Sequence, residues 1–82
     1  MLPVSPTVFR EGPYRFFFFS REEPRMHVHV GSSEGEAKFW LEPQIELAEN
    51  HGIAVREITV VTKIIERRAN EIAAAWHEHF GS

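Results

Sequence analysis

PRMHVHV at residues 24–30 is followed, after a short polar turn, by EAKFWL at residues 36–41. Polar and apolar side chains alternate in both stretches, as they do in strands that turn one face toward a core. In extended conformation the polar faces carry His27 and His29 from the first stretch and Glu36, Lys38 and Trp40 from the second. The opposite, core-facing side carries Val28, Val30, Ala37, Phe39 and Leu41. Because Gly and Ser separate the two stretches, we expect them to form a hairpin.

A second hairpin is predicted on the amino-terminal side of the first. Residues 7–10 and 14–20 are rich in aromatic and β-branched side chains, and Glu11-Gly12-Pro13 between them supplies turn geometry. Residues 16–19 are four consecutive phenylalanines, so both faces of this strand carry large apolar rings. Such a strand is expected to be covered on both sides. One cover is the helix predicted below, and the other is the rest of the fold, a second copy or a different protein.

The carboxyl-terminal part of the chain has a helical period. Ile45 and Leu47 alternate with polar neighbours, which favours a short fifth strand over a helical turn. In residues 55–80 apolar side chains recur at spacings of three, four and seven, which predicts one long amphipathic helix. The predicted fold class is therefore α+β: a small antiparallel sheet of four or five strands, at about residues 7–48, followed by one long C-terminal helix, at about 55–80, packed on it.

The composition limits the class of protein. A chain of 82 residues is expected to form a single domain, 1–82. It has no cysteine, which excludes disulfides and thiolate metal sites. Its net charge of -3 disfavours non-specific binding to nucleic acid. No apolar run approaches the roughly 20 residues that span a bilayer, and the N-terminus lacks a signal-peptide pattern, so we expect a cytoplasmic protein that does not contact membranes.

The histidines are candidates for two kinds of chemistry. His27 and His29 could ligate zinc, but the spacing selects no third ligand among His51, Glu36 and Glu46, so we assign no metal and no cofactor. The same imidazoles could transfer protons near neutral pH while a cation stabilises charge on a phosphate, as in a metal-independent ribonuclease. The candidate catalytic residues are His27, His29, Lys38, Glu36 and Arg15. In the structural alternative, the imidazoles bond backbone groups at the loop or Glu36 across the hairpin.

The aromatic side chains favour a binding role. Phe17, Phe19 and Trp40 are candidate partner-binding residues, on an exposed sheet face or near an exposed strand edge. Single-stranded RNA could stack on the same rings, but the acidic net charge and the lack of an RNA-binding motif disfavour RNA. A protein partner is the favoured ligand.

Ordered sequence blocks run through almost the whole chain. They are TVFR (7–10), YRFFF (14–18), Pro24 with HVHV (27–30), EAKFWL (36–41), LA (47–48), NHG (50–52) and WHE (76–78). Together these blocks closely resemble the bacterial domain of unknown function family DUF4160. Two positions depart from the family pattern: Arg25-Met26 stands where many relatives carry two prolines, and Ala54 stands where many carry Ser at the start of the helix.

The resemblance implies a genomic setting rather than a reaction. Members of the family are often encoded beside a short protein of another family, DUF2442, an arrangement that resembles a toxin and antitoxin pair. We therefore expect a small bacterial protein-interaction module, one component of a type II toxin-antitoxin pair. Its partner would be the product of a neighbouring gene or a second copy of itself. The alternative is a ribonuclease toxin that uses His27 and His29 as acid and base.

Overall fold

Five strands precede two helices along the chain. The computed structural model describes residues 6–21 and 23–81, and residues 1–5, 22 and 82 of the expected domain lie outside the described part. The strands are β1 (Thr7–Glu11), β2 (Tyr14–Phe17), β3 (His27–Ser32), β4 (Gly35–Trp40) and β5 (Glu46–His51). The helices are α1 (Val55–Arg67) and α2 (Ala69–Phe80). The predicted α+β class is confirmed.

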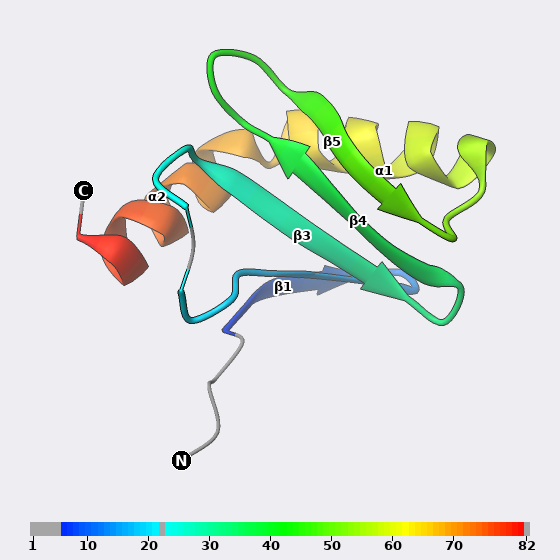
Figure 1. Ribbon diagram of the computed structural model, residues 1–82, viewed down its shortest axis with the longest axis horizontal. Helices are drawn as coiled ribbons and strands as arrows, with labels where there is room; N and C mark the ends of the chain where they lie inside the picture. The colour runs from blue at the N-terminus through cyan, green and yellow to red at the C-terminus, as the bar shows by residue number, and fades with distance from the viewer. Residues whose placement is uncertain (1–5, 22, 82) are drawn as a thin grey trace.

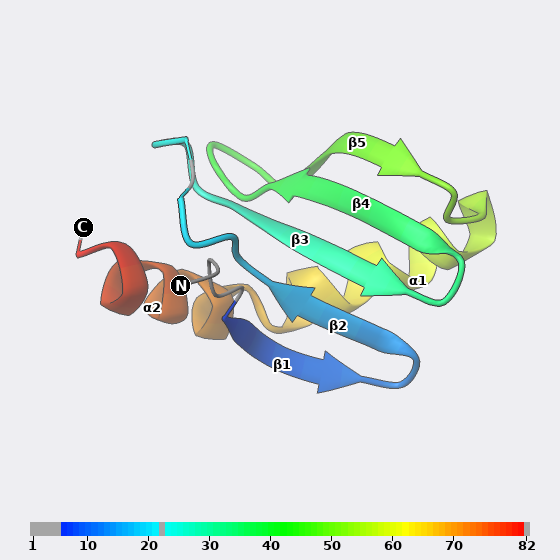
Figure 2. The same ribbon diagram turned by 60° about the horizontal axis from the view of Figure 1, so that its bottom comes forward.

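The sheet is a meander in which each strand pairs with the next one along the chain. Its order is β1-β2-β3-β4-β5, and all neighbours are antiparallel (Figure 1 and Figure 2). Both predicted hairpins are present. In the β3–β4 hairpin, His27 lies opposite Trp40 and Ser32 lies opposite Gly35. The fifth strand is also present, and it ends at His51 rather than near residue 48.

Both helices lie on the same face of the sheet (Figure 2). The side chains between the two layers are fully buried: Phe16, Val28, Val30 and Phe39 from the sheet, and Val61, Ile65 and Ile72 from the helices. Burial of each such side chain contributes about 1.5–3 kcal/mol. Among the described residues, no helix or strand covers the opposite face of the sheet. We call that surface the open face.

The predicted single helix at residues 55–80 is interrupted at Arg68. The backbone there has φ −112° and ψ 21°, outside the helical region. The Arg68 guanidinium carbon lies 3.4 Å from the centre of the Phe9 ring, and its nitrogens donate to Glu11 and Glu71 at 3.0 and 2.9 Å. These contacts draw Arg68 toward β1, so the structure has two contiguous helices. In the described part of the chain, neither helix is long and apolar enough to cross a membrane.

The start of β4 has room for glycine alone. A Cβ built on Gly35 would lie 2.1 Å from the carbonyl oxygen of His51. Next to this contact, the Asn50 side chain bonds the backbone of Ile53, accepting from its N–H at 3.0 Å and donating to its carbonyl at 2.8 Å. The close approach and the Asn50 bonds fix the end of β5 against β4, and this places His51 on the open face.

Candidate functional site

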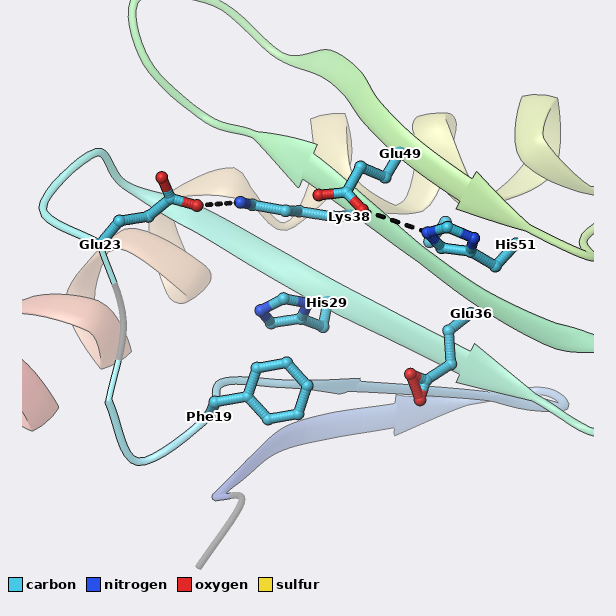
Figure 3. Close-up of a pocket in the computed structure, with 8 residues that line it drawn as sticks. Phe19, Glu23, His29, Glu36, Lys38, Glu49 and His51 are labelled. Carbon is cyan, nitrogen blue, oxygen red and sulfur yellow. Dashed lines mark hydrogen bonds and ion pairs between the residues drawn. The ribbon is translucent and has the colours of Figure 1, made fainter. Parts of the chain in front are cut away.

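The open face carries a shallow pocket of about 360 Å³ over β3, β4 and β5 (Figure 3). Strand pairing brings its side chains together, because His29 on β3 lies opposite Lys38 on β4, and Lys38 lies opposite Glu49 on β5. The pocket is lined by Phe19, Glu23, His29, Glu36, Ala37, Lys38, Glu49 and His51. Its lining therefore combines an aromatic ring, two imidazoles, three carboxylates and one ammonium.

Stacked rings form one wall of the pocket. The His29 ring stacks on Phe17 with centroids 5.5 Å apart, and it approaches Phe19 with centroids 4.2 Å apart. Phe17 is only 4% exposed, because the Arg15 guanidinium and the Phe19 and His29 rings cover it. Phe19 is 41% exposed. Of these two candidate partner-binding residues, Phe19 offers surface, whereas Phe17 is buried by its own chain and is withdrawn as a contact residue.

Lys38 is held by side chains of the same chain. Its ammonium pairs with Glu23 and lies 4.3 Å from the centre of the Trp40 ring. The hydrogen bond from Lys38 lowers the pKa of the Glu23 carboxyl below its ordinary value. The Arg25 guanidinium also lies over the Trp40 ring, 4.1 Å from its centre. Trp40, the third candidate partner-binding residue, is therefore half-buried beneath two cations.

The remaining carboxylates make the pocket acidic. Glu49 lies 3.1 Å from Nε2 of His51, and both side chains are exposed (Figure 3). The Glu36 side chain is exposed as well, and it has no hydrogen-bond or ion-pair partner among residues 6–21 and 23–81. Because Lys38 compensates only Glu23, the carboxylates of Glu36 and Glu49 leave an excess of negative charge on this side of the open face.

His27 is not part of this pocket. It is fully buried, and its ring packs edge-on against Trp40 of β4 and Trp76 of α2. Nδ1 of His27 lies 2.6 Å from the carbonyl oxygen of Arg25 in the loop before β3. The expectation that alternation places His27 on the polar face together with His29 is therefore corrected. The contact of Nδ1 with a backbone carbonyl of the loop agrees with the structural alternative for His27. The two tryptophans enclose its ring.

Arg15 lies beside the pocket, nearer the β1 edge. Its Nε donates to Oγ1 of Thr7 at 2.7 Å, and its guanidinium carbon lies 4.4 Å from the centre of the Phe17 ring. A second depression on the open face is lined by Arg10, Pro13, Arg15, Phe17, Gly31, Ser32, Ser33 and Glu36. Glu36 thus borders both depressions, whereas Arg15 borders only this one.

A family model matches most of the chain. The model, described as a domain of unknown function (DUF4160), covers residues 14–77, from the first residue of β2 into α2. The chain belongs to the DUF4160 family. The matched segment contains every residue that lines the pocket over β3, β4 and β5. No curated protein and no solved structure matches this DUF4160 chain. The expected DUF2442 neighbour stays a prediction.

Three of the five candidate catalytic residues of the DUF4160 protein meet in one pocket: His29, Lys38 and Glu36. Glu23 and Glu49 were not predicted as site residues, and His51 was considered only as a metal ligand. The signal for Glu49 and His51 was weak, because the alternation of apolar and polar side chains fades after Leu47. Glu23 reaches the site from a loop, where no periodic pattern can place it.

The donor set of the DUF4160 protein does not point to a metal. Among residues 6–21 and 23–81, no three His, Cys, Asp or Glu side chains are grouped so that they could hold a metal ion. Three carboxylates against one ammonium would also repel a phosphate group. The partly exposed Phe19 ring lies beside these charged groups.

Proposed function

We propose that this DUF4160 protein is a small protein-interaction module that docks a protein partner on the open face of its sheet. We further propose that it acts in the bacterial cytoplasm as one component of a type II toxin-antitoxin pair. The observation that carries the docking proposal is the one-sided helix layer, which leaves Phe19 partly exposed beside a set of charged side chains. The toxin-antitoxin setting rests on the family resemblance.

The charges of the open face support a protein partner over RNA. The pocket holds Glu23, Glu36 and Glu49 against Lys38 alone, and Lys38 is already paired with Glu23. Binding of RNA without sequence preference depends on cations that follow the phosphate backbone. The pocket lacks such a row of cations, whereas its carboxylates complement the arginine and lysine side chains of a protein surface.

The face is a better docking surface than the β5 edge. β5 is the last strand of the sheet, and no further strand among the described residues pairs with its outer side. Its register shifts opposite Lys38 and Phe39, and it carries Glu46 and Glu49. Bulges and charged side chains are features that discourage the addition of another strand to an edge. The open face offers the partly exposed ring of Phe19 instead.

The ribonuclease alternative has less support from the geometry. It needs two imidazoles at the substrate, but His27 is fully buried with Nδ1 against a backbone carbonyl. His29 lines the pocket, and Lys38, which lies opposite it on β4, is engaged by Glu23. A nuclease would therefore have to use His29 with a second acid or base, and His51 is the other imidazole that lines the pocket.

Co-expression with the product of the adjacent gene tests the proposal. The chain carries an affinity tag, and the copurified adjacent product is measured for the native sequence and for Phe19→Ser and Glu36→Lys. We expect copurification with the native chain and a loss of at least about tenfold with each variant, because an apolar contact and a complementary charge are removed. Growth and RNA integrity are followed in the same cells.

A matched control uses an exposed apolar side chain on the helix layer. Val60 of α1 is 45% exposed, close to the exposure of Phe19, but it lies away from the open face. Val60→Ser should leave copurification unchanged. Copurification that survives both open-face variants, or falls equally with Val60→Ser, would overturn docking on this face. RNA cleavage that disappears with His29→Ala would instead favour the ribonuclease.

A further inference from the structure

The pocket over β3, β4 and β5 holds two carboxylates that no lysine or arginine among residues 6–21 and 23–81 pairs with. Glu36 on β4 lies opposite His51 on β5, and Lys38, two residues further along β4, lies opposite Glu49. Glu36 and Glu49 are therefore diagonal neighbours on the open face, with Cα atoms about 7–8 Å apart. Two glutamate side chains at this spacing can reach one shared group.

Lys38 neighbours both carboxylates on the sheet, but its ammonium is engaged elsewhere. It pairs with Glu23 and lies 4.3 Å from the centre of the Trp40 ring. Figure 3 shows it extended toward Glu23 and away from Glu36. Within the described ranges, the Glu36 carboxylate has no hydrogen-bond or ion-pair partner, and neither has Oε2 of Glu49. The pocket can therefore accept hydrogen bonds that these parts of the chain do not donate.

The other wall of the pocket is aromatic. The Phe19 ring is 41% exposed, and its centroid lies 4.2 Å from that of the His29 ring. Figure 3 shows these two rings across the opening from Glu36. The face of an aromatic ring attracts cations, and guanidinium groups most often occupy such positions. A planar cation in this opening would therefore meet a ring and carboxylates at once.

The same chain shows how such groups hold a guanidinium. The guanidinium carbon of Arg68 lies 3.4 Å from the centre of the Phe9 ring. Its nitrogens donate to Glu11 at 3.0 Å and to Glu71 at 2.9 Å. One phenyl ring and two carboxylates thus surround one arginine. The pocket on the open face has the corresponding groups, a phenyl ring and two carboxylates, and no arginine is among its described lining residues.

We propose that this pocket receives an arginine side chain of the protein partner. The guanidinium lies against the Phe19 ring, and its N–H groups donate to Glu36 and Glu49. The cavity of about 360 Å³ is within the roughly 300–1,000 Å³ of clefts that bind small groups. The inference rests on the proposed function, because it names the group by which the open face recognises the same partner, the adjacent gene product.

The geometry favours arginine over lysine. A guanidinium is planar and carries five N–H donors, so that it can stack on a ring and bridge two carboxylates in a single position. An ammonium is a compact and strongly hydrated charge, and it cannot stack. Elsewhere in the described chain, Arg15 and Arg25 lie over the rings of Phe17 and Trp40, 4.4 and 4.1 Å from the ring centres.

Nuclear magnetic resonance titration of the full, isotope-labelled chain tests the pocket without the partner. The probe is Nα-acetylarginine amide, and the ionic strength is held constant. The comparison probes are Nα-acetyllysine amide and Nα-acetylcitrulline amide, in which a neutral urea replaces the guanidinium. We expect the arginine probe to shift amide signals of β3, β4 and β5 with a dissociation constant of roughly 1–10 mM. The lysine probe should bind at least about threefold more weakly, and the citrulline probe at least about tenfold.

Substitutions separate the ring from the carboxylates. Glu36→Gln and Glu49→Gln keep the size of the side chain and remove its charge, and each should raise the dissociation constant of the arginine probe at least about threefold. Phe19→Leu keeps an apolar side chain and should weaken the arginine probe more than the lysine probe. Glu66→Gln, at an exposed position of α1, is the matched control and should change nothing. Equal affinities for the three probes, or unchanged affinity in both glutamine variants, would overturn the inference.

Co-expression with the adjacent gene product connects the pocket to the partner. Each arginine of that product is replaced by lysine in turn, and one replacement should lower copurification at least about threefold, because the charge is kept while stacking is lost. Copurification that survives every replacement would overturn the inference. If the arginine probe does not bind but copurification still depends on Phe19, the arginine site fails and the proposed function stands. If the adjacent product never copurifies, the proposed function fails, and the probe alone decides whether the pocket binds a guanidinium.

Discussion

The phenol of Tyr14 on β2 donates a hydrogen bond to the carboxylate of Glu57 in the first turn of α1. This contact joins the sheet directly to the helix layer. The hydrogen bond to Glu57, together with burial, raises the pKa of Tyr14 to about 12. The folded protein therefore stabilises the neutral phenol.

Tyr14→Phe should lower the free energy of unfolding by about 1 kcal/mol near neutral pH, because one hydrogen bond is lost and the ring is kept. Folding raises this pKa, so the contribution is complete below the unfolded value of 10.0 and is lost as pH rises toward about 12. Urea unfolding of both proteins at neutral pH and above the unfolded pKa measures the difference. A difference that does not shrink with rising pH would contradict this role of Tyr14.

His27→Ala should destabilise the fold by about 2–4 kcal/mol, because it leaves a cavity between Trp40 and Trp76. His29→Ala changes a half-exposed ring and should cost less than about 1 kcal/mol. Thermal unfolding monitored by circular dichroism compares the two variants. Equal losses of stability in the two variants would contradict the expectation that the buried His27 contributes more to stability than His29.

Arg68→Ala should lower the free energy of unfolding by about 1–2 kcal/mol, since it removes the stacking on Phe9 and two partly exposed ion pairs. Arg56→Ala is the matched control. Arg56 is an exposed residue of α1, and its substitution should change stability by less than about 0.5 kcal/mol. Chemical unfolding of the three proteins provides the comparison, and similar values for the two variants would argue against a special role of Arg68.

Ala54→Asp should stabilise the protein by about 1 kcal/mol. Ala54 is the N-cap of α1 with an extended backbone, φ −63° and ψ 148°, and its side chain makes no capping hydrogen bond. An aspartate there can accept from the backbone N–H groups of the first turn. Ala74→Asp is the control. Ala74 lies on the exposed side of α2 and inside the helix, where no unbonded backbone N–H groups are available to an aspartate, so this substitution should not stabilise the protein. The midpoint of thermal unfolding should rise only for the first variant.

The sequence predicted the elements whose pattern is local. Alternation in residues 26–30 and 36–41 identified the β3–β4 hairpin, and the helical period identified residues 55–80 as helical. The break at Arg68 could not be read in the same way. It depends on Phe9 and Glu11, which approach Arg68 only in the folded chain.

The candidate site was predicted in part for the same reason. His29, Lys38 and Glu36 share the open face because strand alternation fixes their direction. Burial of His27 depends on Trp76, a residue of the last helix, so alternation alone could not reveal it. Glu23 was missed because it reaches Lys38 from a loop that has no repeating pattern.

The meander order has a consequence for synthesis of the chain. All five strands are made before the helices, and each can pair with the strand that precedes it. Translation at about 5–20 residues per second leaves the finished sheet without its helices for a few seconds. During this interval Phe16, Val28, Val30 and Phe39 have no cover, and the nascent chain is exposed to aggregation. That exposure ends only when α2 emerges and Trp76 closes over the start of β3.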